Sequence, residues 1–312
     1  MSQNRQTAIP FTVDMLIMLA LCAATACFYY GFAVISLIAA CVLSCVVCDA
    51  AGTFLLKREI TLKDLSAVIT GLCVSLTLPV GCPLWLAVLA GAVSVCLGKL
   101  PFGDHDRSPF VPPAVGIAFV SVLYPSVFFD YSSALRSSSV TQASLASMLK
   151  NGVSVNATAP ALLNILAGNC PGPVGTGCTF LMAAFLVYLA IRNFSKFACA
   201  FGFTAVCALA AVLFPRVLSG AQVSLVMELG GGILLFSAVF LMTYPNGKLS
   251  SVPVCLLYGA LGGAICMLIR RLGASEEGAP FAVLIMNALA PLFEKAERKL
   301  LRHTAAGGGT DE

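Results

Sequence analysis

Residues 77–103 of the chain read TLPVGCPLWLAVLAGAVSVCLGKLPFG, and residues 243–273 read TYPNGKLSSVPVCLLYGALGGAICMLIRRLG. Both stretches pass from a proline through a Gly-rich apolar segment to a basic residue, and both are followed by Pro-Phe and another apolar segment. Ten positions lead from Lys99 to Pro109 and ten from Arg270 to Pro280. We interpret the two stretches as copies of one structural unit.

The two copies are expected to enter the membrane from opposite sides. The third to fifth apolar segments match the eighth to tenth, and an offset of five segments reverses the direction of entry. The first segment of each copy is its weakest: residues 66–80 are few for a crossing, and residues 222–243 are interrupted by Glu228 and three glycines at 230–232. We therefore predict two short or broken helices whose ends line a site near the middle of the membrane. Close helix packing is the alternative reason for the glycines.

The composition excludes most water-soluble classes of protein. Of 312 residues, 59% are hydrophobic and 10% are charged, whereas globular chains carry about 25% charged residues. So few charges cannot cover a surface that faces water. A soluble enzyme, a disordered protein and a nucleic-acid-binding protein are therefore excluded, and the net charge of +4 is too small to indicate an anionic partner.

The charged residues divide the sequence into apolar runs, most of them long enough to cross about 30 Å of hydrocarbon as a helix. The predicted fold is an all-α integral membrane protein with about ten transmembrane helices, an inverted-topology internal repeat and two short or broken helices. The first run also resembles a signal peptide, but it is long enough to span. The runs are residues 11–30, 31–56, 66–80, 83–97, 111–129, 173–191, 197–214, 222–243, 252–269 and 279–293.

An even number of spans places both termini on one side of the membrane. With the termini in the cytoplasm, the outer segments hold only five of the 18 Lys and Arg residues, namely Arg136, Lys150, Arg216, Arg270 and Arg271. The positive-inside rule favours this orientation, although the adjacent Arg270 and Arg271 are unfavourable on the outer side.

The chain is expected to consist of two membrane halves around one loop. Residues 1–130 form the first transmembrane half, residues 131–172 an outward-facing loop, residues 173–303 the second transmembrane half, and residues 304–312 a disordered cytoplasmic tail. The loop is rich in serine, and its polar residues have to lie in water. It is the only loop long enough to hold a site of its own.

The 14 cysteines are predicted to be structural, because nearly all lie in apolar runs, where cysteine behaves as a small hydrophobic side chain. Cys45 and Cys48 form a CxxC pair, but with no second pair nearby and two histidines in the chain, a zinc site is not expected. An iron–sulfur cluster would need ligands from another chain. Cys170 and Cys178 are the pair to test for a disulfide.

Two acidic residues within predicted spans are candidates for an ion path. Asp49 lies in the second run and Glu228 in the eighth, and an acidic group at membrane depth is costly, so it is a functional candidate by default. The alternatives are an interfacial Asp49 near Lys57 and Arg58, and an interfacial Glu228 paired with Arg216. The sequence has no P-loop, GxSxG, HExxH or dinucleotide-binding GxGxxG motif in its proper context, so no catalytic residue is assigned.

Four segments share their order and content with one known family. They are DLSAVITGLCVSLTLPVGCPLW at 64–85, GKLPFG and SPFVPPAVGIAF within 98–119, GGGILLFSAVFLMTYPNGKLSSVP at 230–253, and EEGAPFAVLIMNALAPLFE at 276–294. With these segments the chain resembles the D-type subunit of the Rnf electron-transport complex, which is related to the B-type subunit of the sodium-pumping NADH:quinone reductase. The resemblance implies a subunit of a ferredoxin:NAD oxidoreductase in a prokaryotic inner membrane, relaying electrons while the complex moves sodium ions or protons.

The resemblance also implies a covalent cofactor in the outward loop. In that family FMN is attached by a phosphoester bond to the threonine of an S/T-G-A-T motif. The corresponding stretch here is GVSVNATAPALL, in which Thr158 takes the flavin-bearing position after Asn156 and Ala157. Asn156 stands at the glycine position of the motif. The implied partners are other membrane subunits, the lipid bilayer and a flavin transferase, and non-covalent riboflavin is a second implied cofactor.

Two further departures lie outside the loop: Tyr244 stands where the family commonly has Asp in a T-D-P turn, and Val111 where it commonly has Asn before Pro112.

Two other functions stay open. Inverted repeats with paired broken helices are a common plan of channels and secondary transporters. The altered motif also fits a flavin-free structural subunit that scaffolds other membrane proteins.

Overall fold

The computed structural model consists of helices and their connections. The described residues are 3–56, 65–102, 108–131, 148–149, 163, 165–168, 172–217, 220–245, 249–273 and 277–307, and no strand occurs among them. The first half supplies α1 (Gln3–Tyr30), α2 (Ala33–Leu55), α3 (Ser66–Thr77), α4 (Leu84–Gly98), η1 (Leu100–Phe102), α5 (Pro112–Leu123) and α6 (Pro125–Phe128). The second half supplies α9 (Thr179–Arg192), α10 (Phe194–Leu213), α11 (Ala221–Gly230), α12 (Leu234–Phe236), the π-helical turn η3 (Ser237–Leu241), α13 (Val252–Leu272) and α14 (Ala279–Gly307).

Each predicted apolar run holds a helix, which confirms the all-helical fold. Six helices are long and apolar enough to cross a membrane, and a seventh crossing results if α11 and the α12–η3 segment, bent by 61° at their break, are taken as one broken span. The other runs hold three shorter apolar helices, α3, α5 and α9, with 12, 12 and 14 residues. These three fall below the roughly 20 residues of a full crossing.

Proline and glycine explain why two runs predicted as full spans hold shorter helices. α5 ends at Leu123 because Pro125 follows Tyr124, whose backbone leaves the helical conformation (φ −129°, ψ 55°). α9 begins only at Thr179, because residues 172–178 contain a proline and three glycines. At the C-terminus, α14 runs to Gly307, past the point at which a disordered tail was expected.

The predicted short helices lie in the middle of the bundle. α3 ends at Thr77 because Leu78, which precedes Pro79, is extended (ψ 155°). Nearly all residues of α3 are buried, and all residues of α12 and η3 are buried. The segment before α9 pairs with the end of α3, since Gly175 N donates to Leu76 O at 2.7 Å. The longer helices therefore surround a core of short ones.

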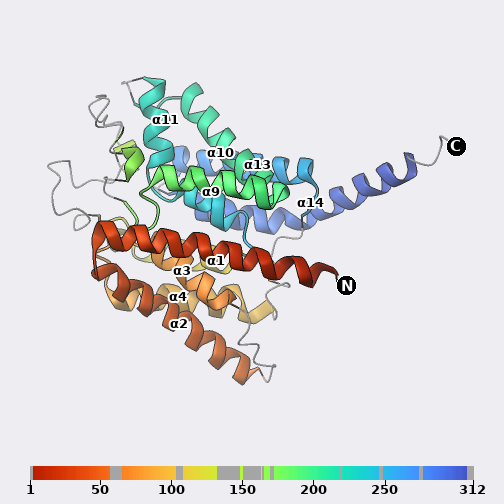
Figure 1. The fold of residues 1–312 in the computed structure, drawn as a ribbon. Coiled ribbons are helices and arrows are strands. Elements are labelled where there is room, and N and C mark those ends of the chain that lie inside the picture. The colour runs from red at the N-terminus through yellow and green to blue at the C-terminus, as the bar shows by residue number, and fades with distance from the viewer. Residues whose placement is uncertain are drawn as a thin grey trace.

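The start of α1 and the end of α14 lie at the same end of the bundle (Figure 1). We name this the terminal end and the opposite one the far end, where α1 ends and α2 begins. The outward faces of the long helices carry large apolar side chains, such as Phe28, Phe54 and Leu272, which are 77–85% exposed. A surface of this kind is typical of helices in contact with lipid.

Glycines allow close contact in two helix pairs, α2 with α4 and α10 with α13. A Cβ added to Gly91 would lie 2.9 Å from a backbone oxygen of α2, and one added to Gly263 would lie 2.5 Å from a backbone oxygen of α10. Cysteines occupy the same interfaces: Cys45 Sγ donates to Gly91 O at 3.5 Å and Cys207 Sγ donates to Gly263 O at 3.6 Å. Both cysteines are free and buried, as expected of structural cysteines.

We expect Gly91→Ala to lower the free energy of unfolding by about 1 kcal/mol, because the added methyl group overlaps the backbone of α2 and forces the helices apart. The Tm of the purified protein in detergent measures this loss. Gly172→Ala is the control, because a Cβ at Gly172 meets nothing within 4 Å. Equal Tm values for the two variants would contradict the prediction.

Candidate functional site

The break between α11 and α12 leaves two helix ends inside the bundle. α11 ends at Gly230 and α12 begins at Leu234, and between them Gly232 has a φ of +74°, which favours glycine. The last carbonyl groups of α11 and the first N–H groups of α12 have no partner within their own helices. The carbonyl end carries partial negative charge and the N–H end partial positive charge. The break therefore calls for one basic and one acidic partner.

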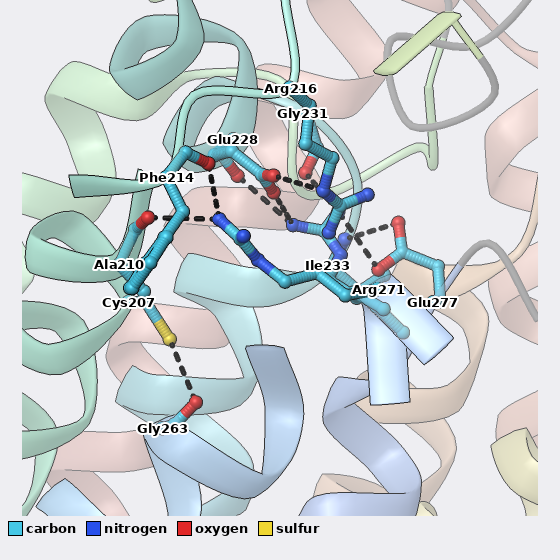
Figure 2. Close-up of polar contacts among 11 residues, drawn as sticks. Cys207, Ala210, Phe214, Arg216, Glu228, Gly231, Ile233, Gly263, Arg271 and Glu277 are labelled. Atoms are coloured by element: carbon cyan, nitrogen blue, oxygen red, sulfur yellow. Dashed lines mark hydrogen bonds and ion pairs between the residues drawn. The ribbon is translucent and has the colours of Figure 1, made fainter. Parts of the chain in front are cut away.

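Arg270 and Glu277 are these partners. Arg270, in the last turn of α13, donates from Nη1 to Glu228 O and from Nη2 to Gly231 O, both at 3.3 Å. Glu277 Oε1 accepts the backbone N–H of Ile233 at 3.2 Å, as Figure 2 shows. Arg270 and Glu277 also contact each other, with 3.4 Å between Nη2 and Oε2. One buried ion pair thus compensates both ends of the broken helix.

Glu228 contacts two arginines. Its Oε2 accepts a hydrogen bond from Arg270 Nη1 at 2.7 Å, and its Oε1 lies 3.1 Å from Arg216 Nε, in the connection from α10 to α11. The second contact is one of charge, because the atoms are not aligned for a hydrogen bond. Arg216 is therefore a partner, as the interfacial alternative expected, but Glu228 is fully buried, with 0% exposure.

The adjacent Arg271 binds the end of α10. Its Nη2 donates to Ala210 O at 2.9 Å and to Phe214 O, and its guanidinium group lies 5.2 Å from the centre of the Phe214 ring (Figure 2). Cations are favoured at the C-terminal end of a helix. Two neighbouring arginines are thus accommodated at the far end because each compensates the C-terminal end of a helix, Arg270 that of α11 and Arg271 that of α10.

Residues on both sides of the predicted flavin position pack against α11. They belong to a small apolar cluster, which we name the anchor cluster and which contains Met148, Leu149, Ile165, Val217, Val223 and Met227. A Cβ on Gly230 would lie 2.8 Å from Ile165 Cγ2, so glycine permits this contact. Thr158, Asn156 and Ala157 lie outside the described residues. The described part of the loop is therefore tied to the first half of the broken helix.

Three polar groups around α11 are buried without a hydrogen-bond partner among the described residues: Arg216 Nη2, Ser224 Oγ and Thr179 Oγ1. Arg216 adjoins Val217 of the anchor cluster, and Ser224 precedes Glu228 by one helical turn. Burial lowers the pKa of Arg216 while Glu228 opposes this shift, and arginine stays charged in proteins. Unpaired buried donors are costly unless water or a ligand binds them.

A second buried ion pair lies near the terminal end. Lys99, directly after α4, donates from Nζ to Asp49 Oδ2 of α2 at 2.8 Å and to Ser66 Oγ of α3 at 2.9 Å. The side chains of Lys99 and Asp49 are 8% and 17% exposed. Asp49 Oδ1 is buried with no hydrogen-bond partner in the described part of the chain. Lys57 and Arg58, the partners considered from the sequence, lie outside that part.

Lys99 and Arg270 hold equivalent positions in the two sequence copies and lie at opposite ends of the bundle. Each stands at the end of the Gly-rich helix of its copy, and each pairs with a carboxylate from a different helix, Asp49 or Glu228. The sequence predicted that Lys99 and Arg270 lie in segments that connect the spans. In the structure both side chains are instead part of the packed interior.

A third acidic residue of the bundle, Asp14 of α1, was not among the predicted site residues. It is 8% exposed, accepts a hydrogen bond from Tyr188 Oη at 2.9 Å and pairs with Arg192 at 3.1 Å, both of α9. Asp14 lies inside the apolar run 11–30, so it is an acidic group at membrane depth, as Asp49 is, and the sequence could have identified it in the same way.

The described residues contain no group of three or more His, Cys, Asp or Glu side chains suited to a metal ion. Cys45 and Cys48 are free thiols. Cys178 is also free, and Cys170, its suggested disulfide partner, lies outside the described residues.

Comparison with known proteins places these sites in one family context. The sequence model of the NQR2, RnfD, RnfE family matches residues 2–301. The D-type subunit of the Na(+)-translocating ferredoxin:NAD(+) oxidoreductase complex of Acetobacterium woodii is 26% identical over 277 residues, 87% of this chain and 83% of that protein. The D-type subunit of the ion-translocating oxidoreductase complex of Escherichia coli K12 is 25% identical over 306 residues, 85% of this chain and 86% of that protein. The B-type subunit of the Na(+)-translocating NADH-quinone reductase of Chromohalobacter salexigens is 28% identical over 258 residues, 78% of this chain and 62% of that protein.

Proposed function

Because the chain belongs to the NQR2, RnfD, RnfE family, we propose that it is a membrane subunit of an ion-translocating ferredoxin:NAD oxidoreductase complex. In this proposal it relays electrons between neighbouring subunits through FMN attached to Thr158, while the complex moves sodium ions or protons. The observation that carries the proposal is the family match over residues 2–301. Other membrane subunits, lipids of the bilayer and a flavin transferase are its partners.

The proposed topology follows from charge and helix order. The chain crosses the bacterial inner membrane about ten times, with the terminal end in the cytoplasm and the far end outward. Residues 1–130 and 173–303 form the two membrane halves, and residues 131–172 form the outward loop. The excess of Lys and Arg in the segments assigned to the cytoplasm supports this orientation.

The unpaired donors at the far end fit the phosphate of FMN. A phosphoester on Thr158 keeps negative charge, and Arg216 Nη2 and Ser224 Oγ are buried donors for which the described residues provide no acceptor. From Leu149 and Ile165 of the anchor cluster, nine and seven residues lead to Thr158, a reach of at most roughly 30 Å and 24 Å. When bound, FMN supplies one-electron and two-electron transfer. We assign no residue to the riboflavin that the family resemblance also implies.

The chain's own contribution at this site is to hold the loop and compensate its charge. The anchor cluster fixes both flanks of the loop on α11, and the Arg270–Glu277 pair fixes the end of α11. Asn156 and Ala157 directly precede Thr158, so they are part of the sequence that a flavin transferase has to recognise. A covalent tether then retains the cofactor whatever its intrinsic affinity.

Asp49 is the stronger of the two acidic candidates for the ion path. Its Oδ1 has no hydrogen-bond partner among the described residues, whereas both oxygens of Glu228 face arginines. A free carboxylate oxygen beside a lysine offers a place where a sodium ion or a proton competes with the ammonium group. Glu228 is better explained as part of the support of the broken helix.

Denaturing electrophoresis with in-gel flavin fluorescence tests the proposal on protein produced together with a flavin transferase. The wild-type band is expected to fluoresce and the Thr158→Ala band to be dark, because a covalent flavin survives denaturation and the variant lacks the hydroxyl that carries it. A control protein shows that the transferase is active. A dark wild-type band beside a fluorescent control would show that Asn156 disables the motif.

The broken helix favours one alternative, a channel or secondary transporter, because half-helices that meet inside a bundle often form transport sites. A flavin-free structural subunit is the second alternative. Uptake measurements in vesicles that contain the purified chain separate these two, since only the transporter moves a solute or an ion without the rest of the complex.

A further inference from the structure

A polar cavity near the terminal end has no part in the proposed electron transfer. It measures about 140 Å³ and lies between α5, α10, α13, α14 and the end of η3. Its polar lining comes from Ser108, Lys196, Tyr244, Tyr258, Asn287 and Glu294. A water molecule takes about 30 Å³, and sites for drug-sized ligands begin near 300 Å³. The cavity therefore suits a small group rather than a flavin ring system.

Lys196 brings a positive charge that no carboxylate compensates among the described residues. Its Nζ donates to the backbone oxygen of Tyr244 at 3.3 Å and lies 5.6 Å from the centre of the Phe11 ring. No acidic oxygen of the described chain lies within 4 Å of it. An ammonium group has three donors and is costly to bury without an anion. Lys196 thus has donors left for a ligand in the cavity.

Asn287 adds a second donor without an acceptor. Its residue exposure is 9%, and its Nδ2 is buried with no hydrogen-bond partner in the described part of the chain. Its Oδ1 accepts a hydrogen bond from Tyr258 Oη at 3.3 Å, and this bond fixes the orientation of the amide group. A buried amide nitrogen in a cavity wall indicates a bound acceptor. Lys196 and Asn287 together select an oxygen-bearing anionic group.

Two helix starts add positive potential to this cavity. Lys196 lies in the first turn of α10, and Pro109 and Val111 line the cavity just before α5 begins. N-terminal helix ends favour anions through their partial positive charge.

The acidic groups nearby have partners of their own. Glu294 in the cavity wall pairs with Arg298 at 3.5 Å. Glu297 accepts the backbone N–H groups of Ser250 and Ser251 and so compensates the start of α13. Of the two charged residues in the cavity lining, Lys196 is thus the one without an ion pair among the described residues.

We propose that this cavity binds a phosphate group, with Lys196 and Asn287 as its donors. The phosphate comes either from the headgroup of an anionic lipid in the adjacent leaflet or from a soluble phosphate. This site lies at the opposite end of the bundle from the anchor cluster, so the proposal stands whether or not Thr158 carries FMN. The cavity lies at the same end of the bundle as the Asp49–Lys99 pair.

Titration of the purified full chain with two probes tests the proposal. Native mass spectrometry follows phosphatidylglycerol, with diacylglycerol as the probe without phosphate, and the shift of Tm follows inorganic phosphate. We expect one phosphate-dependent site per chain and a loss of affinity of about tenfold or more in Lys196→Met, the effect of one lost charged hydrogen bond. Lys196→Arg is expected to retain binding. A response to the lipid assigns the source to the bilayer, and a response to phosphate alone assigns it to the solution.

Two further variants make the test decisive. Lys299→Met removes an exposed basic side chain of α14 at the same end that does not line the cavity, and it should leave binding unchanged. Asn287→Asp keeps the shape of the side chain but places a negative charge in the cavity, so it should weaken binding even if Lys196→Met does not fold. Absence of binding to both probes in the wild type, or equal losses in Lys196→Met and Lys299→Met, would overturn the proposal.

Discussion

Replacing Arg270 by methionine is expected to lower the free energy of unfolding by about 3–5 kcal/mol, which is the usual cost of leaving a buried charge without its partner. Methionine fills much of the same volume, but Glu228 and Glu277 lose their shared counter-ion. The carbonyl groups of Glu228 and Gly231 at the end of α11 also lose their donor. Chemical denaturation of the purified protein in detergent micelles measures the loss.

Two variants show that this cost comes from the buried charge. Arg298→Met is the control, because the Arg298–Glu294 pair lies along one exposed helix face and is worth only about 0.3–0.5 kcal/mol. The double variant Arg270→Met, Glu228→Gln is expected to recover part of the loss, since it removes the carboxylate that loses its 2.7 Å contact with Arg270 and keeps only the charge contact with Arg216. If Arg270→Met costs no more than Arg298→Met, the described network does not stabilise the fold.

Much of the fold could be predicted from local sequence patterns. Every apolar run holds a helix. The length of a run and the prolines and glycines that bound it are local properties of the sequence, and they determine where a helix forms and ends. The broken helix could also be predicted, since the glycines at 230–232 and the acidic Glu228 both interrupt an apolar helix at one place. α5 and α9 are shorter than the apolar runs that contain them. Pro125 ends α5, and the glycines before Thr179 delay the start of α9, whereas the length of an apolar run does not take such residues into account.

The charge partners could not be predicted in the same way. Arg270 and Glu228 are 42 residues apart, and Lys99 and Asp49 are 50 apart, so only the packing of separate helices brings them together. Lys99 and Arg270 stand at helix ends, where a charge count assigns them to water. The helix ends and carboxylates that receive them lie in the interior. The flavin position at Thr158 stays a prediction from family resemblance, because Thr158 lies outside the described residues.

Replacing Lys99 by methionine should cost about 2–3 kcal/mol, less than the change at Arg270. The loss is smaller because Asp49 is 17% exposed, so water can reach its carboxylate once the ammonium group is gone, whereas Glu228 is fully buried. Ser66 Oγ loses the donor that it accepts from as well, but a hydroxyl group can rotate toward another hydrogen-bond partner. The free energy of unfolding in detergent, compared with that of Arg270→Met, measures the difference.

A double-mutant cycle with Asp49→Asn isolates the contribution of the Lys99–Asp49 pair. Asparagine keeps an oxygen that accepts from Lys99 Nζ but removes the charge, so the coupling energy between the two positions should be about 1.5–3 kcal/mol, the range of hydrogen bonds to charged groups. The same two single variants, placed in the assembled complex, should both reduce ion movement if Asp49 Oδ1 is the point at which the ion competes with lysine. Additive effects on stability together with unchanged ion movement would show that the pair neither stabilises the bundle nor lies on the ion path.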